Sequence, residues 1–256
     1  MSTVSDTYTR IAVVTGATSG IGEATARKFA GAGFGVVGNA RARSKLSALE
    51  KEIGQAFCGI AGDAAEEAIV EKLFTAADDR FGRKPDVVVV NAGRGLGGPV
   101  TDVDLEQFKD VLRTNVSGAL ALMKSAARRL VAAQQDGFPE SPADIVVIGS
   151  VVGRHISPFS AVYGASKAAV HSLTESLRRE VGSKGVRVTL VEPGFVLSGF
   201  QAVAGYSDEM IAGVKEKFGP LLTGADVADA IYYVVSQPPH VHISDLLIRP
   251  TRQDYP

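Results

Sequence analysis

Tyr163 and Lys167 are the two residues whose types and spacing point most directly to chemistry. They are four residues apart, and on a helix that spacing puts two side chains on one face, about 6 Å apart along the axis. The unperturbed pKa of a phenol is about 10, which makes it a poor proton donor or acceptor at neutral pH. A nearby ammonium favours the phenolate and lowers that pKa toward the range where acid–base catalysis is efficient. The pair therefore predicts a proton-transfer site, although surface helices carry the same spacing by chance.

Ser150 lies upstream of this pair, directly after an apolar run at 145–149 that is typical of a buried parallel strand. It would therefore stand at the carboxyl end of that strand, the edge at which open α/β sheets bind ligands. A serine hydrolase would instead need a Gly-x-Ser-x-Gly elbow, which this sequence does not contain.

The elements that must position these side chains alternate along the chain. Short aliphatic runs predict strands at 11–14, 34–38, 56–60, 86–90, 144–149, 186–191 and 244–249. The stretches between them predict helices at 20–32, 43–53, 64–81, 104–134, 161–183 and 224–236. Such alternation is typical of an α/β fold with a parallel sheet and helices on both faces. We therefore expect a doubly wound, Rossmann-type sheet of about seven strands and a single domain over residues 1–256.

One segment, 197–223, interrupts the alternation with several glycines and a Gly-Pro pair. It follows a strand at the carboxyl-end side of the sheet. We expect it to act as a mobile lid over the substrate, with an ordinary surface excursion as the alternative. A polar stretch at 134–143 predicts a surface loop.

A glycine-rich turn at 15–22 joins the first strand to the first helix. Glycines there let a pyrophosphate approach the backbone, and the helix N-terminus supplies unpaired N–H groups and the positive end of its dipole. The spacing is Gly-x-x-x-Gly-x-Gly, and no Gly-Lys-Ser/Thr follows, which argues against a P-loop. The turn therefore favours nucleotide binding over a plain helix start.

Taken together, these motifs resemble those of the short-chain dehydrogenase/reductase family. The resemblance runs from about residue 10 to the C-terminus and rests on motifs in the right order: 15–22, Asp63, 91–93, Asn115, Ser150, Tyr163 with Lys167, and 193–194. In that family a serine, a tyrosine, a lysine and a helical asparagine form the catalytic tetrad. The resemblance assigns these roles to Ser150, Tyr163, Lys167 and Asn115.

The end of the second strand indicates which cofactor is preferred. A dinucleotide fold that prefers NAD usually carries an acid there for the ribose 2′-hydroxyl, and Ala40 occupies that place. Arg41 follows and could pair with a 2′-phosphate, and in the resembled family an arginine here marks NADP. Arg41 and Arg43 could instead begin a solvated helix, but two cations at a helix N-terminus oppose its dipole. We therefore expect NADP(H).

The resemblance also implies which residues contact the cofactor. Asp63 matches the adenine contact of the family, and it could equally cap the helix at 64–81. The expected cofactor residues are Gly16, Thr18, Ser19, Gly20, Ile21, Arg41, Asp63, Asn91, Ala92, Gly93, Tyr163, Lys167, Pro193, Gly194 and Val196. One departure from the family is Val90, where many members have an asparagine that helps to hold the central strands.

The reaction implied by the resemblance is hydride transfer between nicotinamide and a small hydroxy acid, alcohol, aldehyde or ketone. Tyr163 would serve as general acid or base, Ser150 would orient the substrate oxygen, and Lys167 would bind the ribose and depress the pKa of the tyrosine. Asn115 would bend its helix and hold a water that links the lysine to solvent.

The C-terminal segments 238–243 and 248–253 resemble one subgroup of the family. It contains NADP-dependent 3-hydroxy acid (serine) dehydrogenases and a clavulanate-type aldehyde reductase, which are tetramers whose tail reaches toward a neighbouring subunit. A carboxylate substrate would need a cation near the tetrad, and Arg94, Arg154 and His155 are the candidates, each of which could equally be a surface residue.

Two alternative functions stay open at this point. A general carbonyl or cyclic-ketone reductase would share the tetrad without preferring a carboxylate. A non-catalytic NADP-sensing protein could keep the glycine turn, but it would not need Ser150, Tyr163, Lys167 and Asn115 together.

Composition excludes several other classes of protein. The net charge is −1 with both signs dispersed, so neither nucleic acid nor an anionic membrane is an expected partner. No apolar run approaches the length of a membrane span, which is about 20 residues. The single cysteine, Cys58, lies in an apolar run and is expected to be a buried small hydrophobe. The histidines show no metal-ligand spacing apart from His240 and His242, so we expect no metal site. A single cysteine and no secretory signal indicate the cytoplasm.

Overall fold

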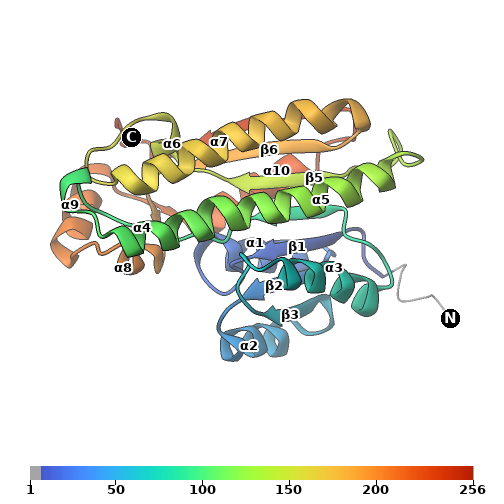
Figure 1. Cartoon of the computed structure of the whole chain (residues 1–256). Coiled ribbons are helices and arrows are strands. Elements are labelled where there is room, and N and C mark those ends of the chain that lie inside the picture. Colours follow the sequence, from blue (N-terminus) through green and yellow to red (C-terminus); the bar gives the residue numbers. More distant parts are fainter. Residues whose placement is uncertain (1–6, 256) are drawn as a thin grey trace.

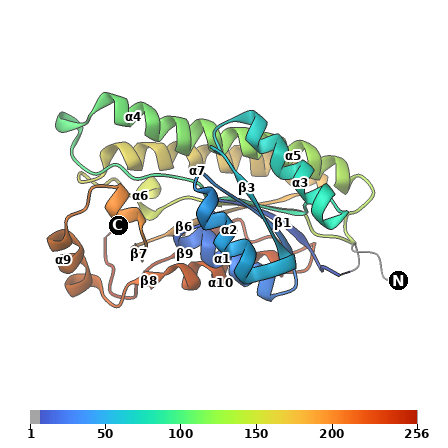
Figure 2. The same ribbon diagram turned by 90° about the horizontal axis from the view of Figure 1, so that it is seen from below.

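Seven parallel strands form the central sheet of the structure, a computed structural model that describes residues 7–255. The strand order is β3-β2-β1-β4-β5-β6-β9 (Figures 1 and 2). The order reverses between β1 and β4, so the crevice at their carboxyl ends is where such a sheet binds ligands. All seven predicted strands are confirmed: β1 Ile11–Thr15, β2 Gly35–Ala40, β3 Phe57–Ala61, β4 Val87–Val90, β5 Asp144–Ile148, β6 Arg187–Pro193 and β9 Asp245–Ile248.

Helices cover both faces of the sheet, as the alternation predicts. Figure 2 shows α3, α4, α5 and α7 on one side and α1, α2 and α10 on the other, and each layer buries its own apolar cluster against the strands. Strands covered on both faces must be apolar throughout, and all four valines of β4 are buried. The bounds of these helices are α1 Gly20–Gly31, α2 Arg43–Ile53, α3 Glu67–Phe81, α4 Leu105–Leu112, α5 Ala119–Gln134, α7 Ala161–Val181 and α10 Gly224–Val235.

Two helix predictions need correction. The helix expected at 64–81 begins at Glu67, because Asp63 caps a turn instead: its Oδ1 accepts a hydrogen bond from the backbone N–H of Ala65 at 3.0 Å. The helix expected at 104–134 is divided into α4 and α5 by the π-helical segment Arg113–Gly118. The widened turn lies at Asn115, and π-turns inside helices are frequent at functional sites.

The predicted excursion at 197–223 contains elements that its glycine-rich sequence does not reveal. Strand β7, Val196–Leu197, pairs with β8, Leu222–Thr223, and helices α8, Phe200–Val203, and α9, Asp208–Phe218, lie between them. The short helix α6, Val151–Arg154, follows Ser150. Figures 1 and 2 show α6, α8 and α9 gathered at one end of the sheet. Single 3₁₀ turns complete the structure at Gly54–Ala56, Val100–Asp102 and Gly182–Lys184.

A buried ion network joins the strands at the opposite end of the sheet. Arg10 pairs with Asp86 at 2.7 Å and with Asp144 at 2.8 Å, and Asp144 also receives both arms of Arg187 at 2.8 Å. The remaining donors of Arg187 reach backbone carbonyls between Val235 and Val241. Because both carboxylates are paired, the network holds β1, β4, β5 and β6 together without an isolated buried charge.

Cys58 is half-buried on β3 and packs against one of the two apolar clusters, and burial raises the pKa of its thiol.

Among residues 7–255, no helix combines the length and apolar character that crossing a membrane requires. In the same part of the chain, no group of three His, Cys, Asp or Glu side chains is placed to hold a metal ion.

Candidate active site

The four tetrad residues meet at the carboxyl ends of the strands. Ser150 lies two residues after the end of β5, and Tyr163 and Lys167 lie one helical turn apart near the start of α7. The Lys167 Nζ donates a hydrogen bond to the carbonyl of Ile148, the last residue of β5, at 2.7 Å. The same Nζ lies 5.7 Å from the centre of the Tyr163 ring. One contact thus fixes α7 against β5 and brings the three predicted side chains together.

Burial shifts the pKa values of the pair in opposite directions. It lowers the pKa of Lys167 to about 8, because an ammonium loses hydration there. It also raises the pKa of Tyr163 above its ordinary value, while a hydrogen bond with Ser150 acts the other way. The expected lowering of the tyrosine pKa by Lys167 is not found: loss of hydration is the largest cause of the shift, and the contact that lowers this pKa is the one with Ser150.

Asn115 connects the helix layer to the loop after β4. Its Oδ1 accepts from the backbone N–H of Arg94 at 2.8 Å, and its Nδ2 donates to the Arg94 carbonyl at 2.9 Å and to Ser166 Oγ at 3.0 Å. Ser166 Oγ in turn donates to the carbonyl of Tyr163 at 2.7 Å. Asn115 is buried, so the π-turn places its amide where it can hold both α7 and the 94 loop.

The glycine turn has the shape that a pyrophosphate needs. Gly16 and Gly20 have φ values of +68° and +53°, the left-handed region that favours glycine. A Cβ on Gly22 would stand 2.3 Å from the carbonyl oxygen of Gly16, so only glycine lets the turn fold back on the helix. Ser19 precedes α1 in an extended conformation and makes no side-chain cap. The first N–H groups of α1 are therefore not capped by Ser19, and the residues fit a phosphate.

Neighbouring strands supply the rest of the predicted cofactor edge. The pKa of the Asp63 carboxyl is lowered, and the largest cause is the hydrogen bond from the backbone N–H of Ala65. Arg41 is exposed and lies near enough to Asp63 to add to this shift. Arg43, by contrast, donates to the carbonyl of Gly59 at 2.6 Å and pairs with Glu50. Of the two arginines, Arg41 is therefore the one placed to meet a ligand at the end of β2.

The remaining predicted cofactor residues line the same edge. Asn91 follows β4, and its Nδ2 donates to the carbonyl of Thr15 at 2.8 Å, which ties the 91–93 segment to the glycine turn. Pro193 ends β6, and the N–H of Gly194 donates to Ile248 of β9 at 2.7 Å. The structure thus brings the predicted contacts of both halves of a dinucleotide to one edge.

Comparison with known proteins agrees with this geometry. The family profile described as short chain dehydrogenase matches residues 10–207. The chain belongs to the short-chain dehydrogenase family. It is 37% identical over 245 residues to a serine 3-dehydrogenase of Agrobacterium fabrum, covering 95% of this chain and 94% of the relative.

Two further relatives of this short-chain dehydrogenase are informative. Sulfoacetaldehyde reductase 2 of Chromohalobacter salexigens is 35% identical over 246 residues, covering 95% of both chains. The closed form of a serine dehydrogenase complexed with NADP+ superposes with a TM-score of 0.86 at 29% identity, covering 96% of both chains. The chain is therefore an oxidoreductase with a Rossmann-type fold.

In this short-chain dehydrogenase the segment 197–223 lies against the tetrad. The rings of Phe200 and Tyr163 are 5.2 Å apart, and a cavity of about 420 Å³ opens nearby. Its walls are mostly apolar and come from the segment 197–223, the loop after β4, helix α4 and the loop before α7: Leu96, Gly97, Gly98, Gln107, Phe159, Val203, Ala204, Gly205, Tyr206 and Met210.

The three cations proposed for a substrate carboxylate are placed differently. Arg154 donates two hydrogen bonds to the fully buried carboxylate of Glu192. Arg94 pairs with Asp110 at 2.9 Å. His155 is exposed at the end of α6. Arg154 would have to leave a buried carboxylate unpaired to bind a substrate, which costs several kcal/mol (about 3–5).

The C-terminal tail contacts its own subunit. The Oε1 of Gln253 accepts from the N–H of Phe195 at 2.9 Å, beside the predicted nicotinamide contacts, and Arg252 donates to Gly219 at 3.2 Å. Sequence reasoning missed Gln253, Phe200, Tyr206, His171 and Glu192. Only Glu192 left a signal in the sequence, as a charged residue inside an apolar strand, because carboxylates are almost never buried unless they are paired.

Proposed function

We propose that the protein is an NADP(H)-dependent oxidoreductase that transfers hydride between nicotinamide and a small hydroxy acid, alcohol, aldehyde or ketone. The observation that carries this proposal is the convergence of Ser150, Tyr163 and Lys167 beside a glycine turn that fits a pyrophosphate. The nicotinamide supplies the hydride chemistry, and the protein supplies geometry and proton transfer.

Tyr163 is the proposed general acid. Burial keeps the phenol protonated at neutral pH but also makes it a weaker acid, and the hydrogen bond with Ser150 acts in the direction that favours donation of the proton to a carbonyl oxygen. Ser150 orients that oxygen, and Lys167 binds the cofactor ribose. Asn115 holds the helix that carries the pair, through Ser166. In the oxidative direction the same phenol oxygen takes the proton from the alcohol.

The preference for NADP(H) is supported by Arg41 and by the relative solved with NADP+. The remaining cofactor contacts in this proposal are those of the glycine turn, Asp63, the 91–93 segment and the 193–196 loop. Two contacts support them: Asn91 is hydrogen-bonded to Thr15 of the glycine turn, and Gly194 is hydrogen-bonded to the end of β9.

The substrate class has two candidates. Two relatives are named for small compounds that carry an acidic group, serine and sulfoacetaldehyde, which supports a small 3-hydroxy acid or its aldehyde. The mostly apolar walls of the cavity and the engagement of Arg154 by Glu192 favour the second candidate, a carbonyl or cyclic-ketone reductase without a carboxylate preference.

A spectrophotometric screen of the purified protein tests this function. NADP+ with 3-hydroxy acids, and NADPH with small aldehydes or cyclic ketones, should show a change in reduced nicotinamide for at least one class. NADP(H) binding without turnover of any class would instead favour the NADP-sensing alternative.

We also propose that the protein is a cytoplasmic homotetramer. The apolar residues of α5 and α7 fall into two sets: Ala126 and Ala127 pack on the protein's own sheet, whereas Ala165, Ala168 and Leu120 are exposed. Close approach of two such helices from different subunits would bury the exposed set. Sedimentation equilibrium should give four chains per particle, and Ala168→Arg should reduce that number. A monomeric wild type would contradict the proposal.

A further inference from the structure

A buried carboxylate lies behind the proposed catalytic serine. Glu192 is on β6 and is fully buried. The Nε of Arg154 donates to its Oε2 at 2.9 Å, and a second donor of the same guanidinium reaches Oε1. The side chain of Arg154 is itself about half exposed. The proposed reaction uses neither residue, so this buried pair needs its own explanation.

His171 connects that pair to Ser150. It lies on α7, one turn beyond Lys167, and its Nε2 accepts a hydrogen bond from the backbone N–H of Ser150 at 3.3 Å. Because Nε2 accepts, the imidazole is neutral and its proton is on Nδ1. That nitrogen faces the Oε2 of Glu192 at 3.6 Å. The contacts therefore run from Arg154 through Glu192 and His171 to the serine backbone.

Two glycines make room for the imidazole. A Cβ on Gly149 would stand 2.4 Å from the Nε2 of His171, and one on Gly153 would stand 2.5 Å from its Cε1. The ring is thus seated against the backbone on both sides of Ser150. Substituting either glycine would displace the ring, so the local sequence is shaped around His171.

We propose that His171 is a positioning residue for the reaction proposed above, an inference that rests on that function. As a neutral acceptor it fixes the backbone of Ser150 and so aims the hydroxyl, while Glu192 and Arg154 fix the imidazole. Protonation of His171 would turn Nε2 into a donor that faces the backbone N–H of Ser150, and the hydrogen bond that holds the serine backbone would be lost.

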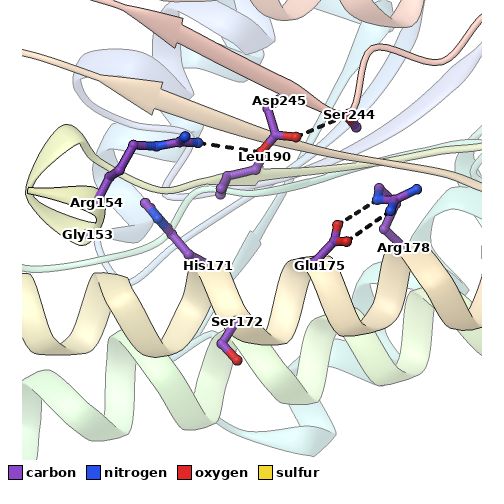
Figure 3. A pocket seen from close by; sticks show the side chains of 9 residues that line it. All are labelled: Gly153, Arg154, His171, Ser172, Glu175, Arg178, Leu190, Ser244 and Asp245. Atoms are coloured by element: carbon purple, nitrogen blue, oxygen red, sulfur yellow. Dashed lines mark hydrogen bonds and ion pairs between the residues drawn. The ribbon is translucent and has the colours of Figure 1, made fainter.

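Solvent can deliver that proton. A cavity of about 390 Å³ opens beside the ring, and Figure 3 shows His171 between Arg154 and the Glu175–Arg178 pair, with Asp245 on the facing strand. Burial lowers the pKa of His171 below its ordinary value, Glu192 and Asp245 oppose that shift, and Lys167 and Arg154 add to it. Activity should therefore be present above this lowered pKa and be lost as the pH falls through it.

Two variants separate the acceptor from the titrating group. His171→Gln keeps an acceptor oxygen near the position of Nε2 but does not titrate, and His171→Leu removes both. With the best substrate of the screen, His171→Leu should lower kcat about tenfold, because a small misplacement of the Ser150 hydroxyl weakens its alignment with the substrate. The same variant should leave the NADP(H) Kd within about twofold. His171→Gln should keep most of kcat and lose the acid limb of the kcat–pH profile. His240→Gln, an exposed control, should keep that limb.

Glu192→Gln provides a second readout if His171→Leu does not fold. Because the carboxylate raises the His171 pKa, its loss should move the acid limb to lower pH, which a purely structural role would not do. Wild-type kcat in His171→Leu, an acid limb that persists in His171→Gln, or an unmoved limb in Glu192→Gln would overturn the inference.

The tautomer of His171 can be read without any turnover. The chain has four histidines, so the imidazole nitrogens of ¹⁵N-histidine-labelled protein can be assigned with His171→Gln. A proton on Nδ1 at neutral pH supports the inference even if no substrate is found, in which case only the proposed reaction fails. A proton on Nε2 would overturn the inference whatever the activity.

Discussion

At the scale of single residues, Tyr163 and Lys167 show how burial sets the protonation of the proposed catalytic pair. The phenol holds its proton more tightly than in water, and the ammonium, with its pKa lowered to about 8, releases its proton more readily. Such opposite shifts at one site are typical of groups that exchange protons with a substrate. At neutral pH the phenol therefore carries its proton, and the hydrogen bond with Ser150 is the contact that favours its release.

Removing the phenol oxygen should abolish turnover and spare the cofactor. Tyr163→Phe should lower kcat by about 10²–10⁴-fold, the usual contribution of a positioned acid, while the NADP(H) Kd changes by less than about threefold. Steady-state kinetics and fluorescence titration measure the two quantities. Tyr233→Phe, on the exposed face of α10, is the matched control and should match the wild type. Retention of more than a few per cent of kcat in Tyr163→Phe would contradict the role.

Arg41 and Arg43 form a natural pair of variants for cofactor choice. Arg41→Ala should reduce the preference for NADP(H) over NAD(H) by roughly ten- to hundredfold, because a charge-assisted contact to phosphate is worth about 1.5–3 kcal/mol. Arg43→Ala should leave the ratio nearly unchanged, because that side chain is held by Gly59 and Glu50. The ratio of Kd values measures this. Equal affinity of the native protein for both cofactors would refute the prediction.

At the scale of elements, the segment 197–223, the proposed lid, packs on the glycine-containing loop after β4. A Cβ on Gly95 would stand 2.5 Å from Ala204 and 2.6 Å from the ring of Phe200, and the N–H of Gly97 donates to the Ala204 carbonyl at 3.1 Å. Helix α8 can approach Tyr163 only because this loop has no side chain in the way. The loop after β4 and helix α8 therefore pack as one surface beside Tyr163, as closure of the proposed lid over the site would require.

Gly95→Val tests that surface. The added side chain should hold α8 away from Tyr163 and raise the substrate KM about tenfold, while the NADP(H) Kd stays within about twofold. Gly213→Ala on α9 is the control, since its Cβ would meet nothing within 4 Å. An unchanged KM in Gly95→Val would show that this contact does not close the site.

The sequence predicted regular elements well and irregular ones poorly. The seven strands of the sheet were found because each is a short aliphatic run, and the four tetrad residues were found through their spaced motifs. Helices α6 and α8 are too short to show a period, and α9 lies among glycines. The π-turn at Asn115 leaves no mark on a helical pattern. His171 and Glu192 were missed because 21 positions separate them in sequence, and only folding brings them together.

At the scale of the whole molecule, the ion network lies at the amino ends of the strands, away from the tetrad. Arg187 serves Asp144 and four backbone carbonyls at once. Because it is buried, its loss leaves those acceptors unsatisfied rather than hydrated. The network is thus expected to set global stability and not catalysis.

Arg187→Met should lower the free energy of unfolding by about 3–5 kcal/mol. Urea unfolding followed by circular dichroism measures it. Arg179→Met is the matched control: it removes a surface pair with Glu175, and the change should stay below about 1 kcal/mol. An equally small change in Arg187→Met would mean that the network contributes little.

The walls of the cavity beside Tyr163 have a consequence for how this enzyme could acquire new substrates. They come from the loop after β4, from α4, from Phe159 and from the segment 197–223, and none of the cavity residues belongs to the glycine turn or to the end of β2. Mutations there can reshape the binding space while the redox partner is held as before. Directed evolution toward a bulkier ketone should therefore accumulate changes at Leu96, Val203 and Met210, and a single ancestral scaffold could diversify by exchanging these walls alone.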